Sequence, residues 1–220
     1  MLGPRDHQGG IAVTITNGYT TLALLKGELG ASTDTADDAK MERAISAASR
    51  QIDRYVGRPH GFWQDSTVQD RDYFSDSGQM CYVDDISTAT GLVVKVDVND
   101  DGAFAQTLTI TTNFIVGPVN AQDEVPQRPY NWIRIVDYGA SMFYRWPSGR
   151  PNVRVTAKFG WPAIPDDVDQ ACLVQSAHLY KASSAAFGLV QMGMDGNIWR
   201  LSARLNPIAE GLLDDYVAHQ

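Results

Sequence analysis

The stretch Glu42–Arg58 reads ERAISAASRQIDRYVGR and carries the clearest helical pattern in the chain. Apolar side chains recur in and just before it at steps of four and three residues, which gathers them on one face of an α-helix. Gly57 stands where a left-handed C-cap belongs, and Pro59 forbids continuation of the helix. We therefore predict a helix over residues 36–56. Its apolar stripe is Met41, Ile45, Ala48, Ile52 and Tyr55.

Three further helices are expected on either side of the middle of the chain. Thr20 can cap a short first helix. Three carboxylates follow Pro165, and because free amide groups at a helix start favour negative charge, we predict a helix over residues 166–186. Asn206 as the cap and Pro207 as the first helical residue begin the last helix.

Residues 62–159 show a different period. Short runs of β-branched and aromatic residues alternate with turn signals rich in Asp, Asn, Ser and Gly, and the spacing leaves no room for crossover helices. Such a pattern predicts an antiparallel sheet or a small barrel. The runs are Met80–Val83, Leu92–Val98, Thr107–Thr111, Phe114–Val116, Asn131–Val136 and Asn152–Phe159.

The order of these elements predicts an α+β fold. We expect mainly a helical bundle, with two N-terminal and two C-terminal helices and an antiparallel β-sheet inserted between them. The predicted parts are a flexible N-terminal arm over residues 1–18, a helical core from 19–61 and 160–220, and a β-rich insertion over 62–159. A chain of 220 residues that is 44% hydrophobic can build one sizeable core, or one core with an attached subdomain.

Composition and charge narrow the classes of partner. The formal net charge is −8, whereas tight nucleic-acid binders are usually basic, because phosphate neutralisation supplies much of their affinity. No apolar run approaches the roughly 20 residues needed to cross a bilayer, and the first residues lack the pattern of a signal peptide. Cys81 and Cys172 lack metal-ligand neighbours, so we expect reduced thiols in a soluble protein made in the cytosol.

The arginines of the first long helix are interleaved with carboxylates along the sequence. Arg43, Arg50 and Arg54 alternate with acids such as Glu42 and Asp53. The interpretation from sequence is a solvated helix face with paired charges, which disfavours sequence-specific binding of DNA.

No pattern of catalytic residues stands out, and we expect neither a cofactor nor a metal site. The histidines His7, His60, His178 and His219 are scattered. The sequence contains no nucleophile elbow, P-loop, dinucleotide fingerprint or zinc-protease motif. His178 falls inside the predicted helix 166–186, where a core histidine is the favoured interpretation over a catalytic base.

One loop matches the first half of a calcium-binding loop. Residues Asp97–Gly102 offer oxygen ligands at alternate positions, with glycine at the sharp turn. The acid that should close such a loop would fall on Leu108, and the flanking residues read as strands where helices are required. We therefore interpret the loop as a hairpin turn.

Four stretches of the helical flanks together match the pattern of a known family. Residues 18–26, GYTTLALLK, are similar to its short first helix, and residues 42–58 resemble its helix end A-A-S-x-x-I-D-x-Y-x-G-R. Residues 155–171, VTAKFGWPAIPDDVDQA, resemble its strand–turn–helix entry, and residues 206–216, NPIAEGLLDDY, resemble its closing helix. By these motifs, which bracket the β insertion, the chain resembles the HK97-type (gp6-like) phage head–tail connector, or adaptor, family.

The resemblance implies a structural virion protein and not an enzyme. A family member forms a dodecameric ring beneath the portal, extends the DNA channel and presents a platform for a stopper or tail-completion protein. Its partners would be the portal protein, the next neck protein and further copies of itself, with DNA passing through without specific binding and with no membrane. Its place would be the virion neck, after assembly in the host cytoplasm. An acidic channel face would let DNA slide past.

The same resemblance indicates which surfaces to consider. In the family the C-terminal part tends to engage the portal, and the helical core makes contacts between subunits. Met and aromatic side chains adapt to a partner and bury large areas, although a loop that covers its own core fits the segment 187–199 equally well. Candidate portal or neck contacts are Phe187, Met192, Met194, Trp199 and Arg200, and candidate inter-subunit residues are Arg43, Arg50 and Arg54.

Two other classes of function stay open from the sequence. A virion binding module could use the β insertion to hold carbohydrate or calcium, and it would need a cluster of aromatic side chains or a metal-binding Asp97 loop. Four tryptophans, two of them inside the insertion, could bind sugars or bases by stacking, although tryptophans spread along a chain are more often core or interface anchors. They are Trp132, Trp146, Trp161 and Trp199. An enzyme assembled from scattered carboxylates would instead need a deep pocket that holds a group with a strongly shifted pKa.

Overall fold

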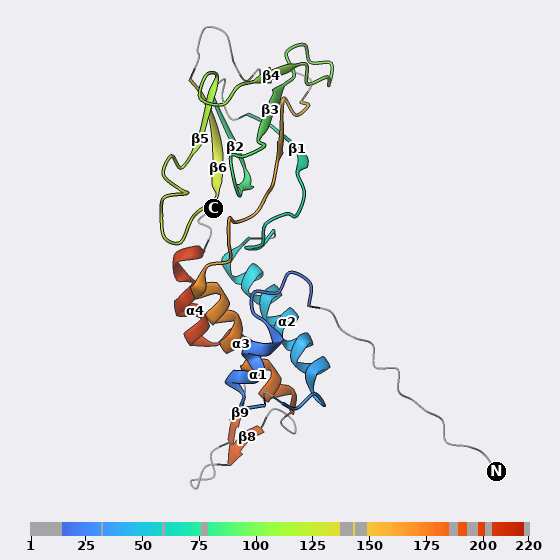
Figure 1. Ribbon diagram of the computed structural model, residues 1–220, viewed down its shortest axis with the longest axis vertical. Coiled ribbons are helices and arrows are strands. Elements are labelled where there is room, and N and C mark those ends of the chain that lie inside the picture. The colour runs from blue at the N-terminus through green and yellow to red at the C-terminus, as the bar shows by residue number, and fades with distance from the viewer. Residues whose placement is uncertain are drawn as a thin grey trace, which may run out of the picture. The chain divides into compact units, whose positions relative to one another are not determined.

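The chain folds into two compact units, a helical unit of Met1–Arg58 with Asp167–Gln220 and a β unit of Pro59–Asp166 (Figure 1). The computed structural model describes residues 15–31, 33–58, 60–75, 79–136, 143, 149–184, 189–192, 198–200 and 204–217. The division falls three residues before the first boundary expected from the sequence and seven after the second, which were drawn at 61/62 and 159/160.

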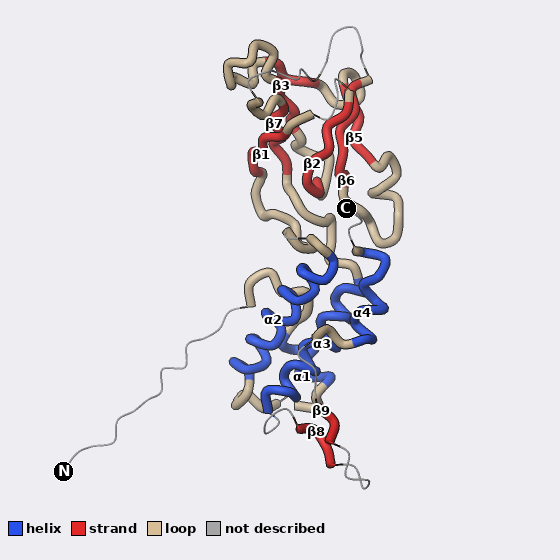
Figure 2. The backbone as a smooth tube through the Cα atoms, turned by 180° about the vertical axis from the view of Figure 1, so that it is seen from behind, coloured by secondary structure: helices blue, strands red, loops and turns tan. Residues whose placement is uncertain are grey.

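The helical unit contains α1 (Leu22–Glu28), α2 (Asp38–Val56), α3 (Asp166–Ser184), α4 (Pro207–Leu213) and a short 3-10 helix, η2 (Asp214–Tyr216). Figures 1 and 2 both show α3 between α2 and α4. Apolar side chains occur on most sides of α3, as expected of a helix that packs between two others. Among the described residues, no helix has both the length and the apolar character needed to cross a bilayer.

The helix ends follow the signals in the sequence, with one correction. Gly57 ends α2 in the left-handed conformation, at φ 70°, as predicted. Asn206 caps α4 by accepting the N–H of Ile208, with Pro207 as the first helical residue, also as predicted. The cap of α1 is Thr21 and not Thr20, because the Thr21 hydroxyl accepts the N–H of Leu24 and the helix begins at residue 22.

The predicted apolar face of α2 forms the centre of the helical unit. Ile45 and Ile52 are completely buried. Polar contacts reinforce the packing against α3: Ser49 Oγ lies 3.4 Å from the Cys172 sulfur, and Gln175 Nε2 donates to Gln51 Oε1 at 2.7 Å. Burying a large aliphatic side chain contributes roughly 1.5–3 kcal/mol, so this face accounts for much of the stability of the unit.

The β unit consists of two antiparallel sheets, which confirms the predicted antiparallel pairing, although a single sheet or a small barrel was expected. One sheet has the order β1-β7-β3-β4 and the other the order β2-β6-β5. Their inner faces share one hydrophobic core, in which Phe114, Ile133, Val155 and Phe159 are almost fully buried. The strands are β1 (Gln69–Tyr73), β2 (Met80–Ile86), β3 (Val93–Val96), β4 (Gln106–Leu108), β5 (Phe114–Gly117), β6 (Tyr130–Ile135) and β7 (Val153–Ala157).

Sequence reasoning missed β1, because its residues QDRDY lack the β-branched composition of a strand. The strand is held by polar pairs with its neighbours. Arg154 of β7 binds Asp72 through two hydrogen bonds of 2.6 and 2.8 Å, and Arg71 binds Asp84 of β2 at 2.8 Å. The Arg154 pair lies across two neighbouring strands and the Arg71 pair joins the two sheets, and together they replace the apolar contacts that usually identify a strand in a sequence.

The α+β class is confirmed, but the emphasis on a helical bundle is not, since the two sheets of the β unit are a large part of the chain. A further antiparallel pair, β8 (Leu189–Met192) with β9 (Ile198–Arg200), lies in a segment for which no strand was predicted. Cys81 and Cys172 are free and buried, and burial raises the pKa of both thiols, that of Cys81 to about 12.

A substitution at Gly160 tests how closely the backbone at this residue approaches the backbone of Trp63. At φ +102° an added Cβ would lie 1.8 Å from the carbonyl oxygen of Trp63. Gly91 is the matched control, because its φ of +77° is also left-handed but nothing lies within 4 Å of an added Cβ. We expect Gly91→Ala to lower the free energy of unfolding by about 1 kcal/mol and Gly160→Ala by about 2–4 kcal/mol, measured by urea unfolding. Equal losses would contradict the close approach.

Candidate functional site

The solvent face of α2 is cationic. The exposed positions Lys40, Arg43, Ala47, Arg50 and Arg54 follow one another at steps of three and four residues. At 100° per residue they fall within an arc of about 80°, on the side of the helix opposite its buried face. We call these five residues the cationic stripe, which includes all three of the arginines singled out from the sequence.

The structure corrects the expectation that the charges of this helix are simply interleaved. The acids that alternate with the arginines in the sequence lie on other faces of α2. Asp53 is buried at 6% exposure, and Glu42 is half-buried. Asp38 pairs with Lys26 of α1 at 2.8 Å. Helical periodicity therefore separates charges that the linear order mixes.

Arg50 is engaged within its own chain. Its Nε lies 3.0 Å from Asp53, and its Nη2 donates to the backbone carbonyl of Asn17 at 2.8 Å. Asp53 also accepts a hydrogen bond from the Tyr19 hydroxyl. Burial raises the pKa of the Asp53 carboxyl, while the Tyr19 hydrogen bond and the Arg50 charge oppose this rise. Arg50 thus ties the residues before α1 to α2, which is a structural role within the subunit.

Arg43 and Arg54 have few partners in the same chain. Arg54 donates Nε to the Arg50 carbonyl at 3.3 Å. Within the described part of the chain, Arg43 has neither a hydrogen bond nor an ion pair. The two guanidinium groups are consequently available to a partner, unlike Lys40, which pairs with Asp37 at 2.6 Å.

The predicted portal contacts lie in or beside the β8–β9 pair. Met192 pairs with Ile198 and Gln191 with Trp199 across the two strands, while Leu189 pairs with Arg200. Phe187 and Met194 lie outside the described residues, as do the side chains of Met192, Trp199 and Arg200. Their role as portal contacts stays a prediction. Residues 189–192 form a short strand and do not alternate between apolar and polar side chains, so the sequence carried no clear strand signal there.

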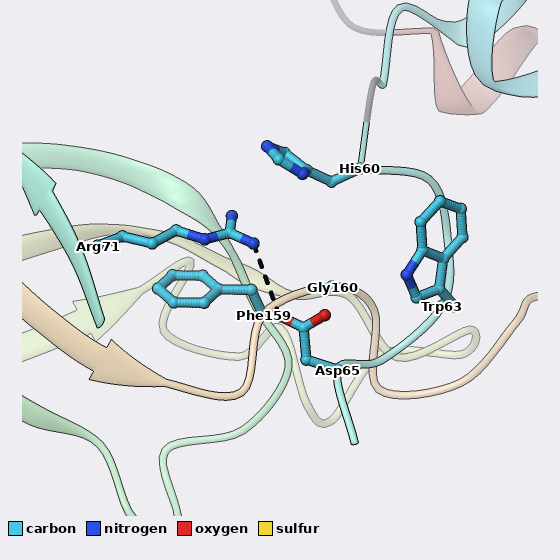
Figure 3. Close-up of a pocket in the computed structure, with 6 residues that line it drawn as sticks. All are labelled: His60, Trp63, Asp65, Arg71, Phe159 and Gly160. Atoms are coloured by element: carbon cyan, nitrogen blue, oxygen red, sulfur yellow. Dashed lines mark ion pairs between the residues drawn. The ribbon is translucent and has the colours of Figure 1, made fainter. Parts of the chain in front are cut away.

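A pocket of about 140 Å³ opens in the β unit, lined by His60, Trp63, Asp65, Arg71, Phe159 and Gly160. Figure 3 shows the Arg71 guanidinium beside the ring of Phe159, 3.9 Å from its centroid, and pointing toward Asp65. Backbone hydrogen bonds fix the two walls, since Asp65 N–H donates to the Phe159 carbonyl at 2.8 Å and Gly160 N–H donates to that of Asp85 at 2.7 Å.

Two polar groups of this pocket, Arg71 and Asp65, form an ion pair whose atoms are too far apart for a hydrogen bond. Arg71 Nη1 bonds Asp84 at 2.8 Å, but Nη2 stands 3.6 Å from Asp65 Oδ2, beyond hydrogen-bond range. Asp65 Oδ2 is buried and accepts no hydrogen bond from the described residues. Water or an amide can donate to Asp65 and accept from Arg71 at once. No sequence signal marked this group, because its members come from separate segments.

The Asp97 loop is a hairpin turn between β3 and β4, as interpreted from the sequence. Both carboxylate oxygens of Asp97 accept backbone N–H groups, from Asn99 at 3.1 Å and from Gly102 at 2.8 Å. Burial alone would raise the pKa of Asp97, but these hydrogen bonds, with those of Asp100 and Asp101, outweigh it and lower the pKa. The carboxylate therefore stabilises the turn.

The remaining candidates do not form one site. Trp161 is buried and donates to Asp85 at 3.2 Å, and Trp132 packs against Gly117. Trp146 lies outside the described residues. His178 is half-buried in α3, and His60 is exposed at the pocket of the β unit. Among the residues that the structure describes, no group of three or more His, Cys, Asp or Glu is placed to hold a metal ion.

The chain is similar in fold to a chain from the neck of an empty GTA (gene transfer agent) particle, a structure computed with C6 symmetry. The match has a TM-score of 0.51 and covers 94% of this chain and 94% of that chain, at 19% sequence identity. No protein-family model and no curated protein matches the sequence. At this identity the likeness establishes a shared fold.

Arg50 and Arg43 should differ in their effect on the stability of the subunit. Arg50→Ala leaves the buried Asp53 without its cation and releases Asn17, so we expect a loss of about 1–2 kcal/mol in the free energy of unfolding. Arg43→Ala removes no hydrogen bond or ion pair within the described part of the chain and should change the free energy of unfolding by less than about 0.5 kcal/mol. Urea unfolding of both variants measures the difference, and equal effects would refute the assignment of Arg50 to the subunit interior.

Asp97 should make the β unit sensitive to acid. A carboxyl whose pKa is lower in the folded state stabilises it above the pKa of the unfolded chain, and this contribution disappears as pH falls through the folded pKa. We expect Asp97→Asn to cost about 1–2 kcal/mol at pH 7 and the cost to shrink below about pH 4. Unfolding measured from neutral to acidic pH tests this, with Asp123→Asn on an exposed loop as the control for net charge. A constant cost would contradict the assignment.

Proposed function

We propose that the chain is a structural subunit of a virion neck, a head–tail connector (adaptor) that works by assembling and not by catalysis. Copies form a ring beneath the portal, extend the DNA channel and provide the platform for a stopper or tail. The observation that carries this proposal is the fold shared, over 94% of both chains, with a chain from the neck of a GTA particle. The motifs of the helical flanks support the same assignment.

Rotational symmetry supports assembly into a ring. The similar neck structure was computed with C6 symmetry. A ring of six or of twelve equal subunits obeys a sixfold axis, so the dodecamer implied by the family resemblance is compatible with it. A closed ring repeats one heterologous interface, in which two different faces of the subunit meet. The proposal therefore requires two complementary surfaces on each subunit.

The charge of the chain suits a conduit for DNA. At a net charge of −8, subunits that turn acidic surface toward the channel repel phosphate and let DNA pass without sticking. The cationic stripe of α2 must then lie away from the channel. The portal contact remains assigned to Phe187, Met192, Met194, Trp199 and Arg200, the segment that contains the β8–β9 pair.

A second candidate function, a virion binding module on the β unit, is favoured by the pocket at Asp65 and Arg71. Its volume of about 140 Å³ and its pair of polar groups suit a small polar ligand. The calcium-dependent version has less support, since both oxygens of Asp97 already accept N–H groups. The carbohydrate version has less support as well, because Trp161 is buried.

The mass of the purified protein, alone and mixed with its portal, tests the proposed function. We expect a monomer or loose oligomer that becomes a defined ring on the portal, as measured by native mass spectrometry. The ring number should be a multiple of six if the neck shares the symmetry of the similar particle. A ring that forms without the portal agrees equally with the proposal.

The opposite result would be a stable monomer whose mass does not change with portal present. Removing residues 187–200 should weaken portal binding and leave the α2–α3 core folded, with circular dichroism as the control for folding. If the protein stays a monomer that does not bind the portal but does bind a sugar or calcium, the binding module is favoured instead.

A further inference from the structure

The cationic stripe of α2 and the end of the chain carry opposite charges. Four of the five residues in the stripe are Lys or Arg, and none is acidic. Residues 207–216, which form α4 and η2, contain three carboxylates and neither Lys nor Arg. We call these three residues, Glu210, Asp214 and Asp215, the acidic segment.

The acidic segment presents its charge to solvent. Asp214 and Asp215 are exposed, and Glu210 is half-buried. The Tyr55 hydroxyl donates to Asp214 at 2.9 Å, and this hydrogen bond, together with the charges of Asp214 and Glu210, raises the pKa of the Tyr55 phenol. The carboxylates thus act as a concentrated negative charge at this end of the helical unit.

The stripe lies on α2 and the acidic segment on α4 and η2, and α3 stands between α2 and α4 in both views (Figures 1 and 2). The last turn of α2 touches η2 through the hydrogen bond from Tyr55 to Asp214, but Tyr55 lies about 100° around the helix from Arg54 of the stripe. The stripe lies on the side of α2 opposite its buried face, which contacts α3 through Ser49. Surfaces placed in this way on separate elements can meet between copies of the chain, as a heterologous interface requires.

We propose that the cationic stripe of one copy binds the acidic segment of a second copy, and that this contact orders the ring. The inference rests on the proposed function, because it specifies which faces meet in the repeated interface. Arg43 and Arg54 make the central contacts, since Arg50 is committed to Asp53 and Asn17 of its own chain. Bidentate pairing with carboxylates suits their guanidinium groups.

Electrostatic self-repulsion explains why such a contact is needed. Each subunit carries a net charge of −8, so copies repel one another unless opposite charges meet where they touch. Small and apolar groups accompany the charges on both sides. Ala47 interrupts the stripe, and Ile208 of α4 is 66% exposed. An exposed Ile208 can pack over Ala47 while the arginines engage the carboxylates around it.

Charge reversal tests the contact. The double variant Arg43→Glu/Arg54→Glu should raise at least tenfold the concentration at which half of the chains are in rings. The variant Glu210→Lys/Asp215→Lys should do the same, while sparing Asp214 and its bond to Tyr55. An equimolar mixture of the two should restore rings in which the variants alternate. The reversed stripe of one variant then meets the reversed acidic segment of the other, and the two unchanged faces also meet. Native mass spectrometry resolves the alternating composition.

The matched control for the arginine variant is Lys181→Glu/Arg128→Glu, which makes the net charge more negative by the same amount at exposed sites outside both surfaces. It should assemble like the wild type. If both reversed variants form rings at the same concentration as the wild type, this inference is overturned and the proposed function is not. A wild-type chain that stays monomeric with and without portal contradicts both the inference and the proposed function. Rings that persist while Arg43→Glu/Arg54→Glu loses binding to duplex DNA would assign the stripe to DNA instead.

Discussion

The burial of one face of α2 is the constraint on which the helical unit depends. Ile45 and Ile52 are removed from water, and Ser49 and Gln51 fix the register against α3. Because side chains on a helix repeat every 3.6 residues, burying these positions determines which others face solvent. The cationic stripe is a geometric consequence of the same packing, so the core and the proposed interface are two sides of one helix.

Residues of opposite charge that alternate in the sequence of α2 have different roles in the structure. Arg50 and Asp53 stay together and hold the residues before α1, whereas Arg43 and Arg54 remain available to a partner. Helix α2 therefore carries one ion pair that acts within the subunit and a charged surface that faces solvent. For a ring of strongly acidic subunits, the second role matters most, since repulsion between like-charged copies must be offset where they touch.

The β unit is held by a core between two sheets and by a polar edge. Phe159 contributes to both, because its ring is buried in the core while the Arg71 guanidinium lies over it. Arg71 in turn links β1 to Asp84 of β2. The pocket at Asp65 exists because Gly160 lets the backbone after β7 approach Trp63 more closely than any side chain would permit.

The sequence by itself determined the elements that local signals encode. The extent of α2, the Gly57 cap, the Asn206–Pro207 start of α4 and the antiparallel strands followed from periodicity and turn chemistry, which act within a few residues. Strand β1 was not predicted because its composition is polar, and β8 and β9 were not predicted because they are short. Only the tertiary structure separated Arg43 from the acids beside it in sequence, and only it brought Asp65, Arg71 and Phe159 together. Such groupings depend on which faces are buried and on contacts between distant segments, and neither is written in the linear order.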